Sequence, residues 1–150
     1  MEYHVERIEL EPQAVAIVRG EVAHDGIAGF LGGAFGEVMG TIGAQGVQPA
    51  GPPIARYEPM EDGFRIEAGF PVTGPVRPIG RVEVAELPGG PVLTVLHRGP
   101  YDQVAAAYHA AEAWLAEHDW EFAAPPWEAY LDGPEVAEPR TIVHVPARPR

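Results

Sequence analysis

The feature that most constrains the fold of this chain is an internal repeat with an offset of about 75 residues. Three strings recur at this offset and in the same order. The pairs are Arg19-Gly20 with Arg98-Gly99, Pro52–Tyr57 with Pro125–Tyr130, and Phe70–Val72 with Val145–Ala147. Because one half alone cannot bury both its helix and its sheet, we expect two similar halves, residues 1–75 and 76–150, in a single domain of residues 1–150.

The first half contains strand-like and helical patterns. Alternation and apolar runs predict strands, and an apolar stripe from Ile27 to Ile42 predicts a helix despite its glycines. Gly20 is expected to end the second strand, and the proline-rich segment before Ile54 can only be a connection. The predicted strands are Val5–Leu10, Ala14–Arg19, Ile54–Glu58 and Phe64–Phe70.

The second half repeats the order of elements. Pro88–Pro91 is expected to be the turn of a hairpin between the first two strands. Pro100 opens an alanine-rich helix from Tyr101 to about His118, because proline is tolerated at a helix start. The predicted strands are Arg81–Leu87, Val92–His97, Trp127–Leu131 and Thr141–Val145.

These patterns predict an α+β fold. The duplicated strand-helix-strand-strand modules are expected to form one antiparallel sheet, with two helices on one face and a ligand groove between the halves.

The charge of the chain limits its partners. With 22 acidic and 10 basic residues the formal net charge is −12, which repels phosphate backbones and anionic lipid surfaces. We therefore expect no direct nucleic-acid binding and no membrane association. The same charge attracts cations, although an acidic surface also serves solubility alone.

Several kinds of site are excluded or disfavoured. The chain has no cysteine, hence no disulfide and no thiol nucleophile, and no serine, hence no serine nucleophile. His97, His109 and His118 do not converge with carboxylates at metal-ligand spacing, so we expect no metal and no cofactor. The sequence shows no signal-peptide pattern and no long uninterrupted apolar run, so a cytoplasmic location is expected.

The residue that differs most between the repeats is Glu128, whose counterpart is Ala55. The strand period of two places Glu128 and Tyr130 on one face, and Tyr57, the counterpart of Tyr130, is expected to reach the same groove. A carboxylate between tyrosines suits a delocalised cation. The alternative is that Glu128 lies on a solvated face and the tyrosines merely cover the sheet.

Four further residues are ligand-binding candidates. Tyr101 and Tyr108 are seven residues apart on the second helix and so share a face, although core packing is the commoner role of such aromatics. Glu67 is a second carboxylate, with an exposed strand position as its alternative. His97 completes the set.

Four strings of the sequence resemble the GyrI-like family, which includes the effector-binding domains of AraC- and MerR-type bacterial regulators. They are His97–Tyr101, Tyr108–Leu115, Pro125–Pro134 and Val145-Pro146. The resemblance implies tandem strand-helix-strand-strand modules with a groove between two helices above the sheet. It also implies that Glu128, beside Tyr130, lies at the bottom of that groove and pairs with cationic drugs.

The chain departs from the family pattern at one acidic position. Many members carry a glutamate four residues before the closing proline, where this chain has Ile142; the first half keeps Glu67 before Pro71. The pocket is therefore expected to be less acidic on one side. No helix-turn-helix segment precedes the first strand, so we do not expect a transcription factor.

The function predicted is multidrug-type binding that sequesters planar, lipophilic, cationic aromatic compounds, without catalysis. The alternative is a hydrolase that opens cyclopropane rings of DNA-alkylating natural products, with Glu128 activating water and a tyrosine polarising the electrophile. A protein partner, such as a topoisomerase, is permitted by the acidic surface but not indicated.

Overall fold

The computed structural model describes residues 3–133 and 135–150, which form two compact units. One unit runs from Pro12 to Leu87, and the other combines the N-terminal strand with the chain from Pro88 onward. The predicted boundary between the halves lies between residues 75 and 76. The strand at Val5–Leu10, expected in the first half, belongs to the second unit, and the strand at Val82–Leu87, expected in the second half, belongs to the first. Pro134, part of the string that carried the family resemblance, lies outside the described residues.

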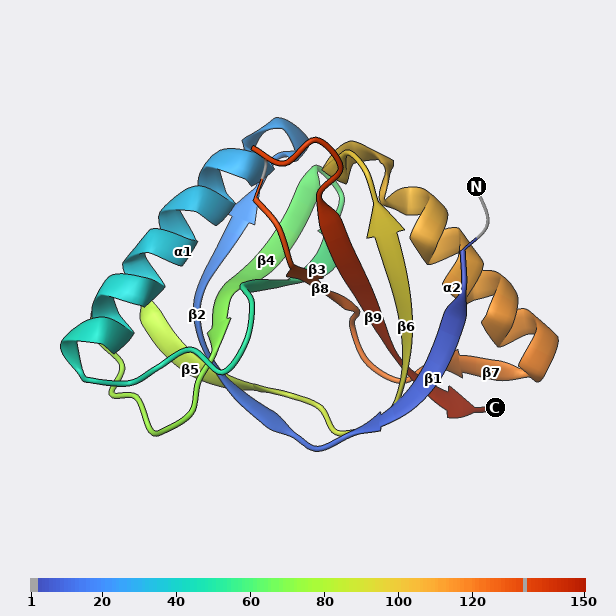
Figure 1. The fold of residues 1–150 in the computed structure, drawn as a ribbon, viewed down its shortest axis with the longest axis horizontal. Helices are drawn as coiled ribbons and strands as arrows, with labels where there is room; N and C mark the ends of the chain where they lie inside the picture. Colours follow the sequence, from blue (N-terminus) through green and yellow to red (C-terminus); the bar gives the residue numbers. More distant parts are fainter. Residues whose placement is uncertain (1–2, 134) are drawn as a thin grey trace. The chain divides into compact units, whose positions relative to one another are not determined.

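The Pro12–Leu87 unit is an antiparallel sheet with one long helix (Figure 1). Its strands lie in the order β3-β4-β2-β5. The elements are β2 (Gln13–Val22), the 3-10 turn η1 (His24–Gly26), α1 (Ile27–Ala44), β3 (Ile54–Met60), β4 (Gly63–Pro71) and β5 (Val82–Leu87).

Helix α1 packs on β2 and β4 through the apolar stripe that the sequence predicted. Ala34, Val38 and Ile42 on this stripe are buried, and the Phe35 ring meets the Phe70 ring edge-on at 5.8 Å. Strand β2 continues to Val22, so the expected end at Gly20 is wrong. A Cβ at Gly20 would lie 2.5 Å from the Phe30 ring, and glycine there makes room for α1 rather than ending the strand.

Within the described residues, one helical segment, His24–Ala44, is long and apolar enough to cross a membrane by length and composition. The sequence analysis expected no uninterrupted apolar run of the length that a membrane helix needs. Its buried residues all lie on the stripe against β2 and β4, the pattern of a helix packed on a sheet.

The second unit has the same arrangement, with one further short strand, β7 (Figure 1). Its strands lie in the order β1-β6-β9-β8, and β7 pairs with the far end of β9. The elements are β1 (Val5–Leu10), β6 (Gly90–Arg98), the 3-10 turn η2 (Tyr101–Gln103), α2 (Ala105–His118), β7 (Trp120–Phe122), β8 (Trp127–Tyr130) and β9 (Arg140–Pro149).

The core of this second unit lies between α2 and the sheet. Helix α2 contributes Ala107, Ala111 and Leu115, which pack on apolar side chains of β6 and β9. The sheet residues of this core are Leu93, Val95, Val143, Val145 and Ala147. Helix α2 thus covers one face of the sheet, and every second side chain of β9 points toward α2.

The predicted hairpin between the strands flanking Pro88–Pro91 is wrong. Strand β5 pairs with β2, whereas β6 pairs with β1 on one side and β9 on the other. Both edges of β6 are therefore occupied by partners distant in sequence, which a local turn signal cannot reveal. Strand β7 was not predicted, because three residues are too few to show a period.

The predicted fold class is confirmed. The described residues form an α+β structure of nine mostly antiparallel strands and two α-helices. Each unit contains a strand-helix-strand-strand module, β2-α1-β3-β4 in one and β6-α2-β8-β9 in the other. The groove between the halves stays a prediction.

Candidate functional site

Glu128 is a buried carboxylate on the helix-covered face of the second unit. It lies in the middle of β8 opposite Val143 of β9, a residue of the core beneath α2. Only 7% of Glu128 is exposed. The alternative of a solvated Glu128 is therefore not what the structure shows.

Two tyrosine hydroxyls hold this carboxylate. The Tyr108 hydroxyl, from α2, donates to Oε2 at 2.7 Å, and the Tyr130 hydroxyl, two residues along β8, donates to Oε1 at 2.9 Å. Among the described residues, no arginine or lysine is found in an ion pair with Glu128. Its two hydrogen-bond donors are thus neutral hydroxyls, which are weaker partners than a cation.

Burial raises the pKa of the Glu128 carboxyl above its ordinary value. The hydrogen bonds from Tyr108 and Tyr130, and the charge of His97, act in the opposite direction but do not offset it. A buried carboxyl with a displaced pKa is typical of binding and catalytic sites. Positive charge placed beside the carboxyl would lower this pKa again.

His97 is buried at the edge of this site, with both ring nitrogens engaged. Nε2 lies 2.9 Å from the Pro100 carbonyl oxygen, which only accepts, so Nε2 carries the proton. Nδ1 lies 2.9 Å from the Tyr3 hydroxyl and forms a hydrogen bond with it. His97 therefore fixes the start of the 3-10 turn that carries Tyr101.

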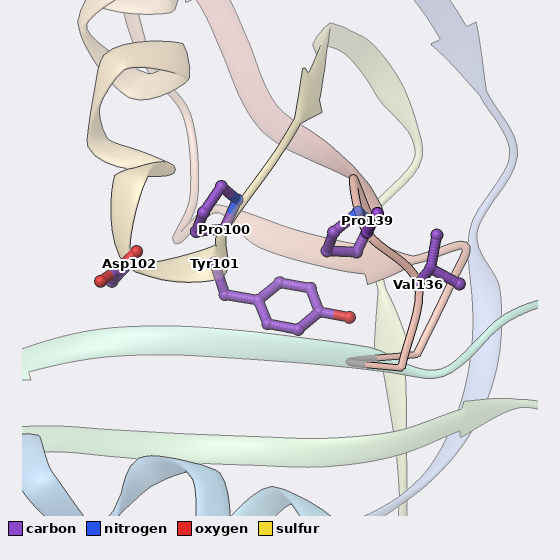
Figure 2. A pocket seen from close by; sticks show the side chains of 6 residues that line it. Pro100, Tyr101, Asp102, Val136 and Pro139 are labelled. Atoms are coloured by element: carbon purple, nitrogen blue, oxygen red, sulfur yellow. The ribbon is translucent and has the colours of Figure 1, made fainter.

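Tyr101 connects the site to the loop between β8 and β9. Its ring meets the Tyr130 ring edge-on at 5.7 Å, and its hydroxyl donates to the Asp132 carbonyl at 2.6 Å. Burial, followed by the charges of Glu135 and Asp132, raises the pKa of Tyr101. The ring also borders an open hollow of about 360 Å³ (Figure 2). The hollow is lined by Pro100, Tyr101, Asp102, Val136, Ala137 and Pro139.

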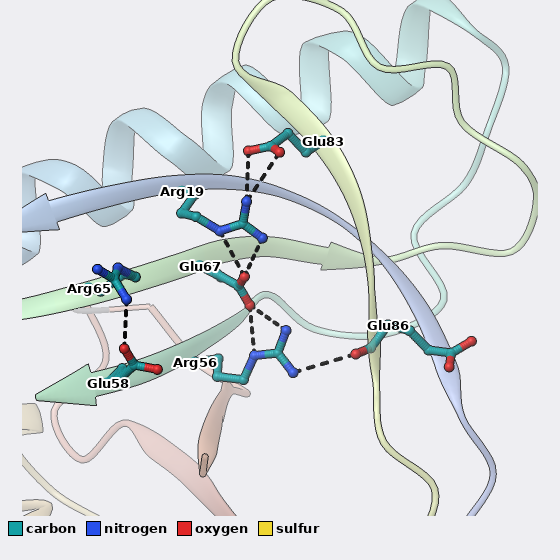
Figure 3. Close-up of polar contacts among 7 residues, drawn as sticks. All are labelled: Arg19, Arg56, Glu58, Arg65, Glu67, Glu83 and Glu86. Atoms are coloured by element: carbon teal, nitrogen blue, oxygen red, sulfur yellow. Dashed lines mark hydrogen bonds and ion pairs between the residues drawn. The ribbon is translucent and has the colours of Figure 1, made fainter. Parts of the chain in front are cut away.

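Glu67 lies in the other unit, inside an ion-pair network (Figure 3). The guanidinium groups of Arg19 and Arg56 each donate two hydrogen bonds to its carboxylate. Burial raises the pKa of Glu67, but the bonds from Arg19 and Arg56 outweigh it and the pKa is lowered. Since Gly20 of β2 faces α1, its neighbour Arg19 and the paired Glu67 face away from the helix.

The predicted site residues thus fall into two groups. Tyr57, on β3, belongs to the same unit as Glu67, and its ring meets Phe64 edge-on at 5.7 Å. The second unit brings together the remaining five candidates: Glu128, Tyr130, Tyr108, Tyr101 and His97.

The sequence reasoning missed Thr141 and His144 of β9. Thr141 is fully buried, opposite Tyr130, and its hydroxyl has no hydrogen-bond partner among the described residues. His144 stacks on Trp127 at 4.9 Å on the opposite face, with a pKa lowered by burial to about 4. Thr141 is two residues before Val143 and four before Val145, so the period of two in this strand could have shown that Thr141 points inward with them.

A metal centre finds no support in the side chains that the structure describes. No group of three or more His, Asp or Glu side chains in residues 3–133 and 135–150 is placed to hold a metal ion.

The family is settled by a match over almost the whole chain. The model of the GyrI-like small molecule binding domain matches residues 1–147, so the chain belongs to the GyrI-like family. It is therefore a small-molecule-binding domain. No curated protein matches the sequence.

Solved structures share this fold at low identity. The EcmrR C-terminal domain has a TM-score of 0.87 at 22% identity, with 100% of both chains covered. In the EcmrR–DNA complex the chain covers 58% of the EcmrR chain, so it spans little more than half of that protein. SAV2435 bound to tetraphenylphosphonium has a TM-score of 0.68 at 16% identity, covering 99% of this chain and 94% of SAV2435.

A hydrolase from Listeria innocua is also similar, with a TM-score of 0.66 at 13% identity, covering 96% of this chain and 91% of the hydrolase. At such identities these structures support the fold alone.

Proposed function

We propose that this domain binds lipophilic, planar aromatic cations and that Glu128 supplies the counter-charge. The observation that carries the proposal is a buried carboxylate held by two tyrosine hydroxyls and no cationic side chain. A ligand cation would provide the partner that the described side chains do not. The proposed function is sequestration, without a chemical step.

The surroundings of Glu128 suit such a ligand. Tyr108, Tyr130 and Tyr101 present aromatic rings beside the carboxylate, and ring faces attract cations. Coulomb attraction is stronger in a buried site than in water, so one carboxylate suffices. The net charge of −12 raises the local concentration of cations around the protein.

A ligand that reaches Glu128 has to displace a tyrosine hydroxyl. Both carboxylate oxygens already accept a hydrogen bond, and Glu128 is 7% exposed. Tyr108 and Tyr130 are both half-buried, so either side chain could turn outward. SAV2435, a protein of the same fold, has been solved with tetraphenylphosphonium, and this supports a lipophilic cation as the ligand class here.

The test is a titration of rhodamine 6G followed by fluorescence anisotropy. Micromolar binding is expected for the wild type, with affinity reduced about 10- to 100-fold in Glu128→Gln if a buried charge pair is lost. Glu117→Gln, which neutralises an exposed carboxylate on α2, is the matched control and should bind as the wild type does. Equal affinity of the two variants for the dye would sink the proposal.

The second candidate is a hydrolase that acts on cyclopropane-containing DNA-alkylating compounds. A carboxyl with a raised pKa is a better proton donor and acceptor for catalysis than an ordinary glutamate, and Tyr130 or Tyr108 could polarise an electrophile beside Glu128. Incubation with such a compound and analysis of products by mass spectrometry separates the candidates. Turnover that Glu128→Ala abolishes would favour the hydrolase, whereas an intact compound favours sequestration.

Other features of the function stay predictions. A cytoplasmic location, the lack of nucleic-acid binding and the possibility of a protein partner are proposals based on charge and composition. Electrophoretic mobility with DNA, and co-purification from cells, are the measurements that address them.

A further inference from the structure

Thr141 is a buried polar side chain that no neighbour satisfies. It is 0% exposed, and its Oγ1 has no hydrogen-bond partner among the described residues. A hydroxyl buried in this way destabilises the protein unless it finds a partner. A bound ligand with a polar group could supply the missing hydrogen-bond partner of this hydroxyl.

The register of the strands places Thr141 within the Glu128 site. Thr141 of β9 lies directly between Tyr130 of β8 and His97 of β6. Directly opposite residues in an antiparallel pair point to the same face, so all three point toward α2. Glu128 is one step further along β8 on this face, at a diagonal Cα separation of about 7–8 Å from Thr141.

Neither neighbour in this row is hydrogen-bonded to the Thr141 hydroxyl. The two ring nitrogens of His97 are engaged by the Tyr3 hydroxyl and the Pro100 carbonyl. The Tyr130 hydroxyl donates its one proton to Glu128. The hydroxyl of Thr141 thus remains as a donor and acceptor beside a carboxylate that is itself a candidate ligand contact.

We infer that Thr141 is a second ligand-contacting residue of this site and that its hydroxyl hydrogen-bonds a polar group of the bound cation. The inference rests on the proposed function and narrows the ligand class. The preferred ligand carries a hydrogen-bonding group, such as an amine N–H or a carbonyl oxygen, within a few ångströms of its positive charge. A cation without any such group would gain from Glu128 but not from Thr141.

Two probes separate these contributions. Rhodamine 6G carries N–H donors and an ester carbonyl beside its delocalised charge, whereas tetraphenylphosphonium has a charge but no hydrogen-bonding group. Their dissociation constants are measured by anisotropy and by calorimetry for the wild type, Thr141→Val and Thr141→Ser. Valine matches threonine in shape but lacks the hydroxyl, and serine restores the hydroxyl.

The expected result is a change in selectivity. Thr141→Val weakens rhodamine 6G binding about 3- to 10-fold, the worth of one hydrogen bond, and leaves tetraphenylphosphonium binding unchanged. Thr141→Ser restores the affinity for rhodamine 6G. Without ligand, Thr141→Val raises Tm by about 2–4 °C, because the unsatisfied buried hydroxyl is gone.

Other outcomes overturn the inference or the function on which it rests. Equal losses for both probes in Thr141→Val would make Thr141 a structural residue, and unchanged affinity for both would remove it from the site. A lower Tm for ligand-free Thr141→Val would show that the hydroxyl is already satisfied, which also overturns the inference. If Glu128→Gln left the affinity for both probes unchanged, the proposed function itself would be overturned.

Discussion

The Tyr130 hydroxyl donates a 2.9 Å hydrogen bond to Glu128, two residues earlier on the same strand. The backbone of β8 sets this pair, because residues two apart in a strand share a face. The Tyr101 ring in turn packs edge-on against the Tyr130 ring. The charge of Glu128 is thus coupled to an aromatic side chain that a ligand would have to move, and this coupling can be measured.

Glu128→Gln should change how stability depends on pH. Since the pKa of Glu128 is raised in the folded protein, folding favours the protonated carboxyl. The free energy of unfolding should therefore fall as pH rises from the ordinary glutamate pKa, about 4.3, through the raised value. Urea unfolding of ligand-free protein between about pH 4 and 8 should show the free energy of unfolding of the wild type falling relative to that of Glu128→Gln as pH rises. Parallel curves would contradict the prediction.

Tyr130→Phe should shift the pH dependence of cation binding. The variant keeps the ring against Tyr101 but loses one donor to Glu128, so the pKa of Glu128 rises further. Ionisation, and with it binding of tetraphenylphosphonium, should then need a higher pH than in the wild type. Titrations at several pH values measure the midpoint; an unchanged midpoint would show that the hydroxyl does not control the carboxyl.

The strand alternation and the helical period made the grouping of the candidate residues predictable. Alternation placed Glu128 and Tyr130 on one face, and the helical period placed Tyr101 and Tyr108 on one face of the preceding helix. The predicted start of that helix at Tyr101 is wrong, because Tyr101 lies in the 3-10 turn η2 and α2 begins at Ala105. The structure brings these residues together within one unit. Local periodicity was enough here because each element carries its own inward-facing pattern.

Features set by contacts between distant segments were not predictable in this way. Strand β5 pairs with β2 and not with β6, because β1 and β9 occupy both edges of β6. The partners of Glu67 are arginines on two other strands. Gly20 looked like a strand end because the Phe30 ring that requires it is not its neighbour in sequence. Thr141 looked like an ordinary strand residue.

Glu67→Gln should destabilise the Pro12–Leu87 unit. Its carboxylate joins Arg19 and Arg56, and its side chain is 17% exposed, so the loss of its charge leaves two guanidinium groups poorly matched. We expect a cost of about 1–2 kcal/mol in the free energy of unfolding at neutral pH. The rhodamine 6G titration of the same variant tests the ligand role predicted for Glu67, since a network residue alone would leave affinity unchanged.

Two glycines should respond to alanine in opposite directions. A Cβ at Gly69 of β4 would lie 1.9 Å from the Ala16 carbonyl oxygen, so the two paired strands would have to move apart. We expect Gly69→Ala to cost about 2–3 kcal/mol. Gly36→Ala, on an open face of α1, should stabilise by about 1 kcal/mol because alanine favours helix. Thermal unfolding of both variants checks the pair, and a stable Gly69→Ala would refute the close approach.

His144→Phe should remove a loss of stability on the acid side. Burial holds the pKa of His144 at about 4 in the folded protein, below its ordinary value of 6.5, while its ring stacks on Trp127. Protonation therefore favours the unfolded chain, and stability should fall as pH drops from about 6.5 toward about 4, by about 1–3 kcal/mol in total. Phenylalanine keeps the stacking but does not titrate, so the variant should lose less stability than the wild type as pH drops through this window. This slope is opposite in sign to that of Glu128, and combining Glu128→Gln with His144→Phe should leave the window flatter than either single change does. A double variant that still loses stability there would assign the acid response to groups other than these two.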